Sequence, residues 1–305
     1  MKDKALIFSG SGNPVFARKL SEMLKAPMGK QEVGKYPNDE IRVRILEEIN
    51  NKTVIVVQTL ASPIESNFFE FALLVDALRR SNPKTIIGVI PWLAYSLQDE
   101  QFLPGEAISA KLISQWLDCL RLNVIIIVDV HSNKVVSNFK TKTIIVPQIE
   151  IIKDIIQQRI SMNTIFVAPD SGSDERTKTI ANRFKIKMLT LNKIRDRYTG
   201  KIHYTEFHEN VSGKDCFIFD DVIITGNTVI DSALLLKEHG AKSIVVYCTH
   251  ALFAKDSIPR IKQSPIDELV VTDTLLISKN QQFNKLKIIS AVPAVANSIN
   301  YLLNK

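Results

Sequence analysis

Short runs of β-branched and apolar residues alternate with amphipathic stretches along almost the whole chain, and this alternation limits the possible folds more than any other feature. The runs are apolar at nearly every position, as expected for strands buried on both faces of a parallel sheet. They cover residues 5–8, 53–58, 85–90, 124–129, 143–146, 164–168, 187–190, 216–219, 243–248, 269–272 and 287–290. Strands that alternate with helices predict an α/β fold with parallel sheets and right-handed crossovers.

The amphipathic stretches predict the helices of this fold. They cover residues 15–24, 67–80, 107–120, 149–158, 174–184, 229–239 and 293–303. In the second stretch, Phe68, Phe71, Val75 and Leu78 recur at helical intervals, which places them on one face. Pro293 opens the last stretch and suits the first turn of a helix.

The number of predicted strands is large for one doubly wound sheet, so the 305 residues are expected to form two α/β domains. We place the boundary after Pro147, which gives domains of residues 1–147 and 148–290. The stretch 192–213 is polar and lacks periodicity, and it predicts a long loop or hairpin. Such segments often act as lids over a site, although an ordinary surface hairpin fits the pattern equally well.

Composition narrows the possible classes of protein. With 45% hydrophobic and 23% charged residues, the chain can bury a sizeable core. The net charge of +7 attracts anions, and a phosphorylated small molecule explains it as well as nucleic acid does, so charge alone does not decide. The basic residues are scattered and form no aromatic-basic cluster of an RNA-binding type, so nucleic acid is not expected as a partner. No apolar run approaches the ~20 residues of a membrane span. The cysteines at 119, 216 and 248 lie far apart in apolar surroundings, which predicts buried, reduced thiols in a cytoplasmic protein.

The strongest chemical signal follows the run 216–219, where two carboxylates precede a polar turn that opens a helix. The residues concerned are Asp220, Asp221, Thr225, Gly226, Asn227 and Thr228. Backbone N–H groups at the start of a helix suit a phosphate, and neighbouring carboxylates can hold sugar hydroxyls or a divalent cation. The string stands at the carboxyl end of a strand, where open sheets bind ligands. It therefore predicts a sugar-phosphate site, with a capped helix and solvated acids as the alternative.

This string resembles the phosphoribosyl-pyrophosphate loop that phosphoribosyltransferases share with ribose-phosphate pyrophosphokinases. Other segments typical of the second family follow one another in order along nearly the whole chain. They are residues 36–40, 95–99, 108–112, 129–131, 169–172, 192–195, 240–241, 249–250 and 272–274. Their succession resembles the ribose-phosphate pyrophosphokinase family. The resemblance implies an α/β fold of two similar phosphoribosyltransferase-type domains, each a mostly parallel sheet flanked by helices, with a C-terminal helix at 291–305 that returns to the first domain.

The resemblance also implies the reaction, which transfers the diphosphoryl group of MgATP to the 1-hydroxyl of ribose 5-phosphate. The products are phosphoribosyl pyrophosphate, used in nucleotide biosynthesis, and AMP. The turn at 225–228 and the acids before it would bind ribose 5-phosphate. His131 and Asp170 would contact Mg²⁺. By the same resemblance, Lys193 and Arg195 would be catalytic. Their spacing would put both on one face of an extended segment, from which they could neutralise the transferring group.

The resemblance further assigns an ATP site. Its residues are Tyr36, Asp39, Glu40, Gln98, Asp99 and Arg176, with Tyr36 stacking on the nucleotide. In the family, the segment at 36–40 completes the ATP site of a neighbouring subunit. This implies a homo-oligomer that is built from dimers and reaches at most a hexamer.

Some positions depart from the family pattern. Leu97 replaces an arginine, Glu100 and Gln101 replace basic residues, Ile224 replaces an acid, and Ser173 and Asn227 replace glycines. Leucine cannot hydrogen-bond to a triphosphate, and a glutamate facing it would repel. Two alternatives to the active enzyme therefore remain: a catalytically weak or inactive regulatory relative, and a phosphoribosyltransferase with the same loop. The length of the chain and the segment at 36–40 oppose the second alternative.

Overall fold

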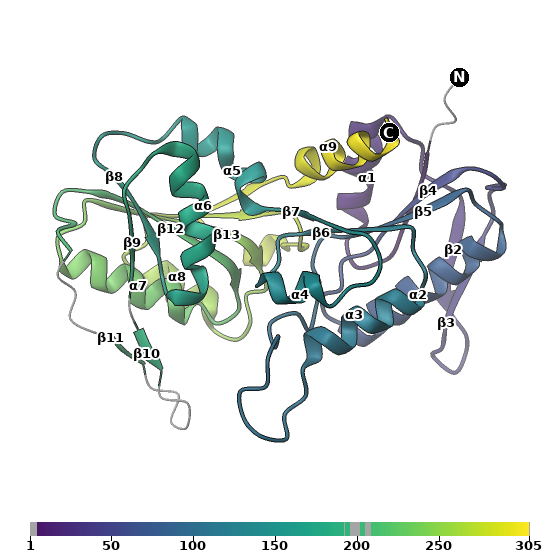
Figure 1. Ribbon diagram of the computed structural model, residues 1–305, viewed down its shortest axis with the longest axis horizontal. Helices are drawn as coiled ribbons and strands as arrows, with labels where there is room; N and C mark the ends of the chain where they lie inside the picture. Colours follow the sequence, from purple (N-terminus) through teal and green to yellow (C-terminus); the bar gives the residue numbers. More distant parts are fainter. Residues whose placement is uncertain (1–4, 192, 196–201, 205–208, 305) are drawn as a thin grey trace. The chain divides into compact units, whose positions relative to one another are not determined.

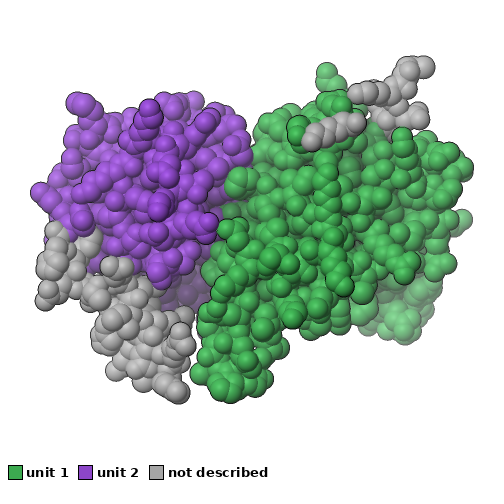
Figure 2. Space-filling model, in the orientation of Figure 1, with its two compact units in different colours: residues 1–147, 274–276, 290–305 green, residues 148–273, 277–289 purple. Residues whose placement is uncertain are grey.

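The computed structural model describes residues 5–191, 193–195, 202–204 and 209–304. The chain divides into two compact units (Figure 2). Unit 1 comprises residues 1–147, 274–276 and 290–305, and unit 2 comprises residues 148–273 and 277–289. Each unit has a parallel sheet with helical connections, which confirms the predicted fold class.

Unit 1 contains a parallel sheet whose strands lie side by side in chain order (Figure 1). The strands are β1 (Leu6–Ser9), β4 (Thr53–Val57), β5 (Thr85–Ile90), β6 (Val124–Val128) and β7 (Thr143–Val146). The connections contain helices α1 (Pro14–Leu24), α2 (Ile64–Arg80), α3 (Ser109–Cys119) and α4 (Asn133–Ser137). Its core is almost entirely aliphatic and aromatic, with Phe8, Val56 and Phe71 fully buried.

Two further elements complete unit 1. An antiparallel hairpin of β2 (Gln31–Lys35) and β3 (Ile41–Ile45) lies between α1 and β4 in the chain. Helix α9 (Val292–Leu303) contacts α1 and β7, and Figure 1 shows it in yellow beside the purple α1. Val292, Val295 and Ile299 of α9 are buried, so this late segment covers part of unit 1.

Unit 2 contains a second parallel sheet, in the order β15-β14-β13-β12-β8-β9. The strands are β8 (Thr164–Ala168), β9 (Met188–Thr190), β12 (Asp215–Ile223), β13 (Ser243–Ala251), β14 (Glu268–Thr272) and β15 (Leu286–Ile289). The helices are α5 (Gln148–Gln157), α6 (Asp174–Phe184), α7 (Asn227–Glu238) and α8 (Ser257–Gln263). One of its core clusters contains several aromatic side chains, with Phe219 contacting Phe166 and Tyr247 at centroid distances of 4.9 and 5.4 Å.

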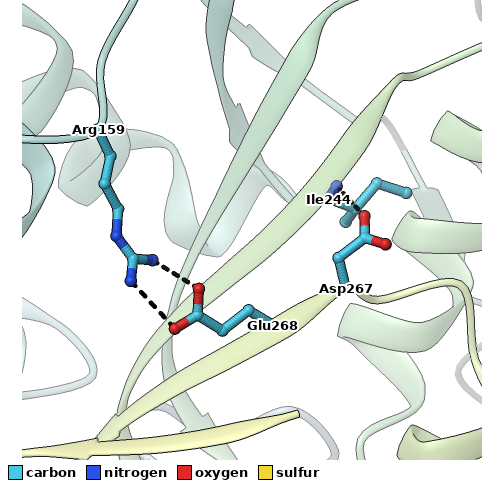
Figure 3. A network of polar contacts seen from close by, with 4 residues as sticks. All are labelled: Arg159, Ile244, Asp267 and Glu268. Carbon is cyan, nitrogen blue, oxygen red and sulfur yellow. Dashed lines mark hydrogen bonds and ion pairs between the residues drawn. The ribbon is translucent and has the colours of Figure 1, made fainter.

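A bidentate ion pair ties the first helix of unit 2 to the sheet (Figure 3). Arg159, just after α5, donates two N–H groups to the carboxylate of Glu268 on β14, at 2.7 and 3.1 Å. The Glu268 carboxylate raises the pKa of Arg159. The adjacent Asp267 accepts the backbone N–H of Ile244 on β13 at 2.7 Å, so two successive carboxylates fix the start of β14.

The predicted strands and long helices agree with the structure to within a few residues at each end. Among the described strands and α-helices, those missed are β2, β3, α4 and α8. The hairpin was missed because its residues are exposed or half-buried and show no apolar run, and the two helices are too short for a periodic signal. Within the stretch 192–213, β10 (Lys193–Arg195) pairs antiparallel with β11 (Ile202–Tyr204), while residues 192, 196–201 and 205–208 lie outside the described part.

Two other expectations can be compared with the described residues. Cys216 and Cys248 are buried free thiols as predicted, but Cys119 is exposed, because it ends α3 on the side away from the core. Among the described helices, none has the length and apolar character needed to cross a membrane.

Candidate active site

The predicted sugar-phosphate residues lie at the carboxyl end of β12, which continues past the apolar run to Ile223. Asp220 and Asp221 are only 7% and 5% exposed. The chain then turns at Gly226, whose φ of 78° lies in the left-handed region, and α7 begins at Asn227. A Cβ atom on Gly226 would also lie 3.3 Å from Ile261, so both the conformation and the space favour glycine here.

A residue that the sequence did not indicate, Arg260 on α8, holds this turn. Its Nη1 donates to Oδ1 of Asn227 at 2.6 Å and to the carbonyl of Thr225 at 3.4 Å. The asparagine that replaces the family's glycine therefore has a defined partner. The guanidinium also brings positive charge to the start of α7, where a helix already favours an anion.

Two acidic segments meet beside this turn because β8 and β12 are adjacent parallel strands. Burial, together with the carboxylates of Asp221 and Asp170, raises the pKa of Asp220 well above its usual range, and Arg176 opposes the rise. The Ser173 hydroxyl donates to Asp220 at 3.3 Å, and its backbone N–H donates to Asp170 at 3.1 Å. The serine that departs from the family's glycine thus bonds to both acidic segments.

The predicted ATP residues of unit 1 fall into two groups. Tyr36, Asp39 and Glu40 form the tip of the β2–β3 hairpin, where the Tyr36 N–H donates to the Glu40 carbonyl at 2.8 Å. Asp39 has a φ of 68° and lies 3.5 Å from the ammonium of Lys35. All three are exposed, with Tyr36 at 50%, so the tip is available to a ligand or to another chain.

The second group, Gln98 and Asp99, follows β5 and contacts the segment that follows β6. The Ser132 hydroxyl donates to the Asp99 carboxylate, and Lys134 forms an ion pair with Glu100. Glu100 raises the pKa of Lys134 through this contact. The unusual negative charge at Glu100 is therefore balanced, and His131 lies on the segment that provides both partners.

The remaining predicted residues belong to unit 2. Arg176 is half-buried on α6 and acts electrostatically on Asp220. Lys193 and Arg195 occupy alternate positions of β10, which begins three residues after β9 ends; their side chains lie outside the described part. Of the predicted metal ligands, His131 belongs to unit 1 and Asp170 to unit 2. The described residues contain no group of three or more His, Cys, Asp or Glu side chains set up to hold a metal.

A parallel sheet with a buried acid pair near the carboxyl end of one strand, and a glycine turn after that strand at a helix N-terminus, defines a protein of the phosphoribosyltransferase type. Residues 5–120 match the family model described as the N-terminal domain of ribose phosphate pyrophosphokinase, and residues 204–305 match the phosphoribosyl synthetase-associated domain. The chain belongs to the ribose-phosphate pyrophosphokinase family, which confirms the resemblance seen in the sequence.

The similarity extends over whole chains. Ribose-phosphate pyrophosphokinase from Campylobacter jejuni is 31% identical over 293 residues, which cover 96% of this chain and 94% of the relative. The Helicobacter pylori protein of the same name is 30% identical, with 96% and 91% covered. The crystal structure of phosphoribosylpyrophosphate synthetase from Mycobacterium smegmatis matches with a TM-score of 0.91 and 26% identity, over 99% of both chains.

Proposed function

We propose that this protein transfers the diphosphoryl group of ATP to the 1-hydroxyl of ribose 5-phosphate, which yields phosphoribosyl pyrophosphate and AMP. The observation that carries the proposal is the buried pair Asp220–Asp221 near the carboxyl end of β12, with the glycine turn that opens α7 just after this strand. The similarity to ribose-phosphate pyrophosphokinases over more than nine tenths of the chain supports the same reaction.

Ribose 5-phosphate binds with its phosphate at residues 225–228 and its ribose hydroxyls at Asp220 and Asp221. The helix N-terminus and Arg260 supply positive potential for the phosphate. Carboxylates accept hydrogen bonds from hydroxyls, so the acid pair suits the sugar. The 1-hydroxyl is thereby held as the nucleophile, and alignment supplies much of the rate in phosphoryl transfer.

Magnesium fits the acidic part of this site. Burial, and after it the neighbouring carboxylates of Asp221 and Asp170, raise the pKa of Asp220, and hard oxygen donors with surplus negative charge suit this cation. A few protein ligands suffice, because Mg²⁺ keeps waters and binds substrate phosphates as well. When bound, it neutralises triphosphate charge and orients the phosphate oxygens. Asp170 is the carboxylate ligand, and His131 contributes directly or through water.

The remaining roles follow the resemblance. Lys193 and Arg195 neutralise the charge that develops on the transferring group, because cations so placed stabilise phosphoryl transfer. Tyr36, Asp39 and Glu40 bind the nucleotide from the hairpin tip. Gln98, Asp99 and Arg176 complete the ATP contacts.

The protein acts as a homo-oligomer that is built from dimers and reaches at most a hexamer. The exposed tip at 36–40 supports this arrangement, because an exposed hairpin can reach a site on another copy. Three free cysteines agree with a reducing compartment such as the cytoplasm.

The two alternatives have less support. Leu97 favours a regulatory relative, but the other departures are accommodated: Glu100 is balanced by Lys134, and Ser173 bonds to Asp220. A phosphoribosyltransferase would not require similarity to ribose-phosphate pyrophosphokinases in both units.

The test has two parts. AMP formation from ATP should depend on ribose 5-phosphate; its absence under varied nucleotide, metal and phosphate would contradict the proposed reaction. In calorimetry, Asp221→Ala and Thr228→Ala should each weaken ribose 5-phosphate binding about ten- to a hundredfold, since a charge-assisted hydrogen bond contributes roughly 1.5–3 kcal/mol. Glu238→Ala, at the exposed far end of α7, is the control. Unchanged affinity in both variants would remove the site assignment.

A further inference from the structure

The two units repeat one strand plan. In each, a parallel strand and the helix after it lead to a short segment that pairs with that strand, at Met28 in unit 1 and β9 in unit 2. An antiparallel hairpin follows, and then parallel strands laid down in chain order. Val54 on β4 pairs with Leu6 and Ile86, just as Cys216 on β12 pairs with Ile165 and Ile244.

Two further contacts fix the same register. The backbone bond from Lys84 to Lys52 in unit 1 corresponds to the bond from Lys242 to Lys214 in unit 2. The bridge of Ile7 to Met28 corresponds to the pairing of Phe166 with Met188. β1 is thus the counterpart of β8, and β4 is the counterpart of β12.

This register identifies what stands in unit 1 where unit 2 has its acids. Four residues beyond Val54, Gln58 takes the position of Asp220, and Thr59 takes the position of Asp221. Likewise, Ser11 takes the position of Asp170. The corner of unit 1 that corresponds to the sugar-phosphate site therefore has none of the three carboxylates, and it carries hydrogen-bond donors instead.

A carboxylate from elsewhere fills that corner. Glu70 on α2 is only 6% exposed. It accepts hydrogen bonds from the backbone N–H of Ser11, from the Ser11 hydroxyl at 2.6 Å and from the Gln58 amide at 3.1 Å. Gln58 in turn accepts the backbone N–H of Gly12 at 2.9 Å.

The loop after β1 is shaped to bring these donors together. A Cβ on Gly12 would lie 2.3 Å from the carbonyl oxygen of Thr59, so only glycine allows the approach to the end of β4. The loop precedes the N-terminus of α1; its Ser11 N–H donates to Glu70, and its Gly12 N–H donates to Gln58, whose amide donates to Glu70. Donors gathered beside a helix N-terminus favour an anion. The bound anion is the protein's own carboxylate.

We propose that Glu70 is a built-in anion that occupies the counterpart of the sugar-phosphate site in unit 1. The protein then binds one ribose 5-phosphate per chain, in unit 2, because the corresponding corner of unit 1 is already filled. The identity of the sugar phosphate rests on the proposed function, whereas the role of Glu70 rests on its contacts alone.

The experiment removes the internal anion and supplies an external one. Glu70→Ala leaves a carboxylate-sized space lined by the donors of Ser11 and Gln58. Formate should raise its Tm by about 2–4 °C more than chloride at equal ionic strength, while the wild type shows no such difference. Asp76→Ala, which removes an exposed carboxylate from the same helix, is the control and should not respond to formate. Equal effects of formate and chloride on Glu70→Ala would overturn the proposal.

A second variant covers the case in which Glu70→Ala does not fold. Glu70→Gln keeps the shape and removes the charge, and its Tm should fall below that of the wild type without a response to formate; an equal or higher Tm would overturn the proposal. Calorimetry of the wild type should give one ribose 5-phosphate per chain, and two would also overturn it. If ribose 5-phosphate does not bind while formate still rescues Glu70→Ala, the proposed function fails and the internal anion stands.

Discussion

Asp220 is placed where ionisation is unfavourable, beside two other carboxylates and away from water. Such a residue costs stability in the ligand-free protein and serves a purpose only when a cation or sugar hydroxyls are present. Unfavourable ionisation of this kind is characteristic of binding sites, where burial and like charges shift pKa values.

The raised pKa of Asp220 gives a prediction with a definite sign. Below the unfolded-state pKa, near 3.8, Asp220 is protonated in both the folded and the unfolded protein, so its ionisation does not lower the free energy of unfolding. As the pH rises from there to the raised folded pKa, the unfolded state releases its proton first, and stability falls by about 1.4 kcal/mol per pH unit. Asp220→Asn should therefore be more stable than the wild type at neutral pH, and its advantage should disappear near pH 4.

Urea unfolding at a series of pH values, with a chelator present, measures this difference. Glu238→Gln, an exposed carboxylate on α7, controls for the loss of an acid. A wild type that is as stable as Asp220→Asn at neutral pH would show that the burial and carboxylate contacts do not disfavour the ionised form.

At the residue scale, the sequence predicted the parts of the site that are local in the chain. Asp220, Asp221 and the turn at 225–228 form one continuous string, so strand, acids and helix start could be recognised together. Arg260 could not be, because its contact with Asn227 depends on the packing of α8, a helix too short to show periodicity. The role of Glu70 could not be predicted for a similar reason: it lies within a helix, and its partner Ser11 is 59 positions away in the sequence.

At the element scale, the buried strands were predictable, because a strand that packs against helices on both faces is apolar at nearly every position and forms a visible run in the sequence. The β2–β3 hairpin has no such signal, since its side chains are exposed or half-buried. Only its tip, residues 36–40, was identified, because that segment resembles the family's. In the loop after β5, the sequence shows where residues depart from the family pattern, such as Glu100. It does not show that Lys134 on α4 forms an ion pair with Glu100 and balances its charge.

This pairing makes Leu97→Arg informative about the loop. An added guanidinium that reaches the triphosphate would gain roughly 1.5–3 kcal/mol in the transition state, so kcat/KM for ATP should rise about ten- to a hundredfold. Affinity for ribose 5-phosphate should stay nearly unchanged, because that substrate uses the loop after β12.

Steady-state kinetics checks this prediction. Leu103→Arg, an exposed leucine in the same loop, controls for added charge alone. If Leu97→Arg gains nothing over an active wild type, another cation already serves the triphosphate; Lys134 is the first candidate, and Lys134→Ala should then lose activity.

At the scale of the whole molecule, the proposed use of the hairpin tip by a neighbouring subunit predicts complementation. Tyr36→Ala and Lys193→Ala chains should each be nearly inactive alone. Mixed dimers place both defects in one site and leave the other intact, so equal mixing should restore about a quarter of wild-type activity.

The assay is AMP formation after the two proteins are dissociated and reassembled together. A chain that carries both substitutions, mixed with either single variant, is the control and should restore nothing. Confirmed mixed oligomers without activity would mean that the tip serves the site of its own chain.

Helix α9 bears on how the protein is made. Its buried side chains cover unit 1, yet the ribosome produces it only after the strands of unit 2. Domains usually fold as they emerge, N-terminal part first. Here the first unit to emerge must wait for a segment translated after the second, so a chain interrupted inside unit 2 leaves apolar surface of unit 1 uncovered. That surface would mark unfinished chains for chaperones and proteases, while finished chains cover it themselves.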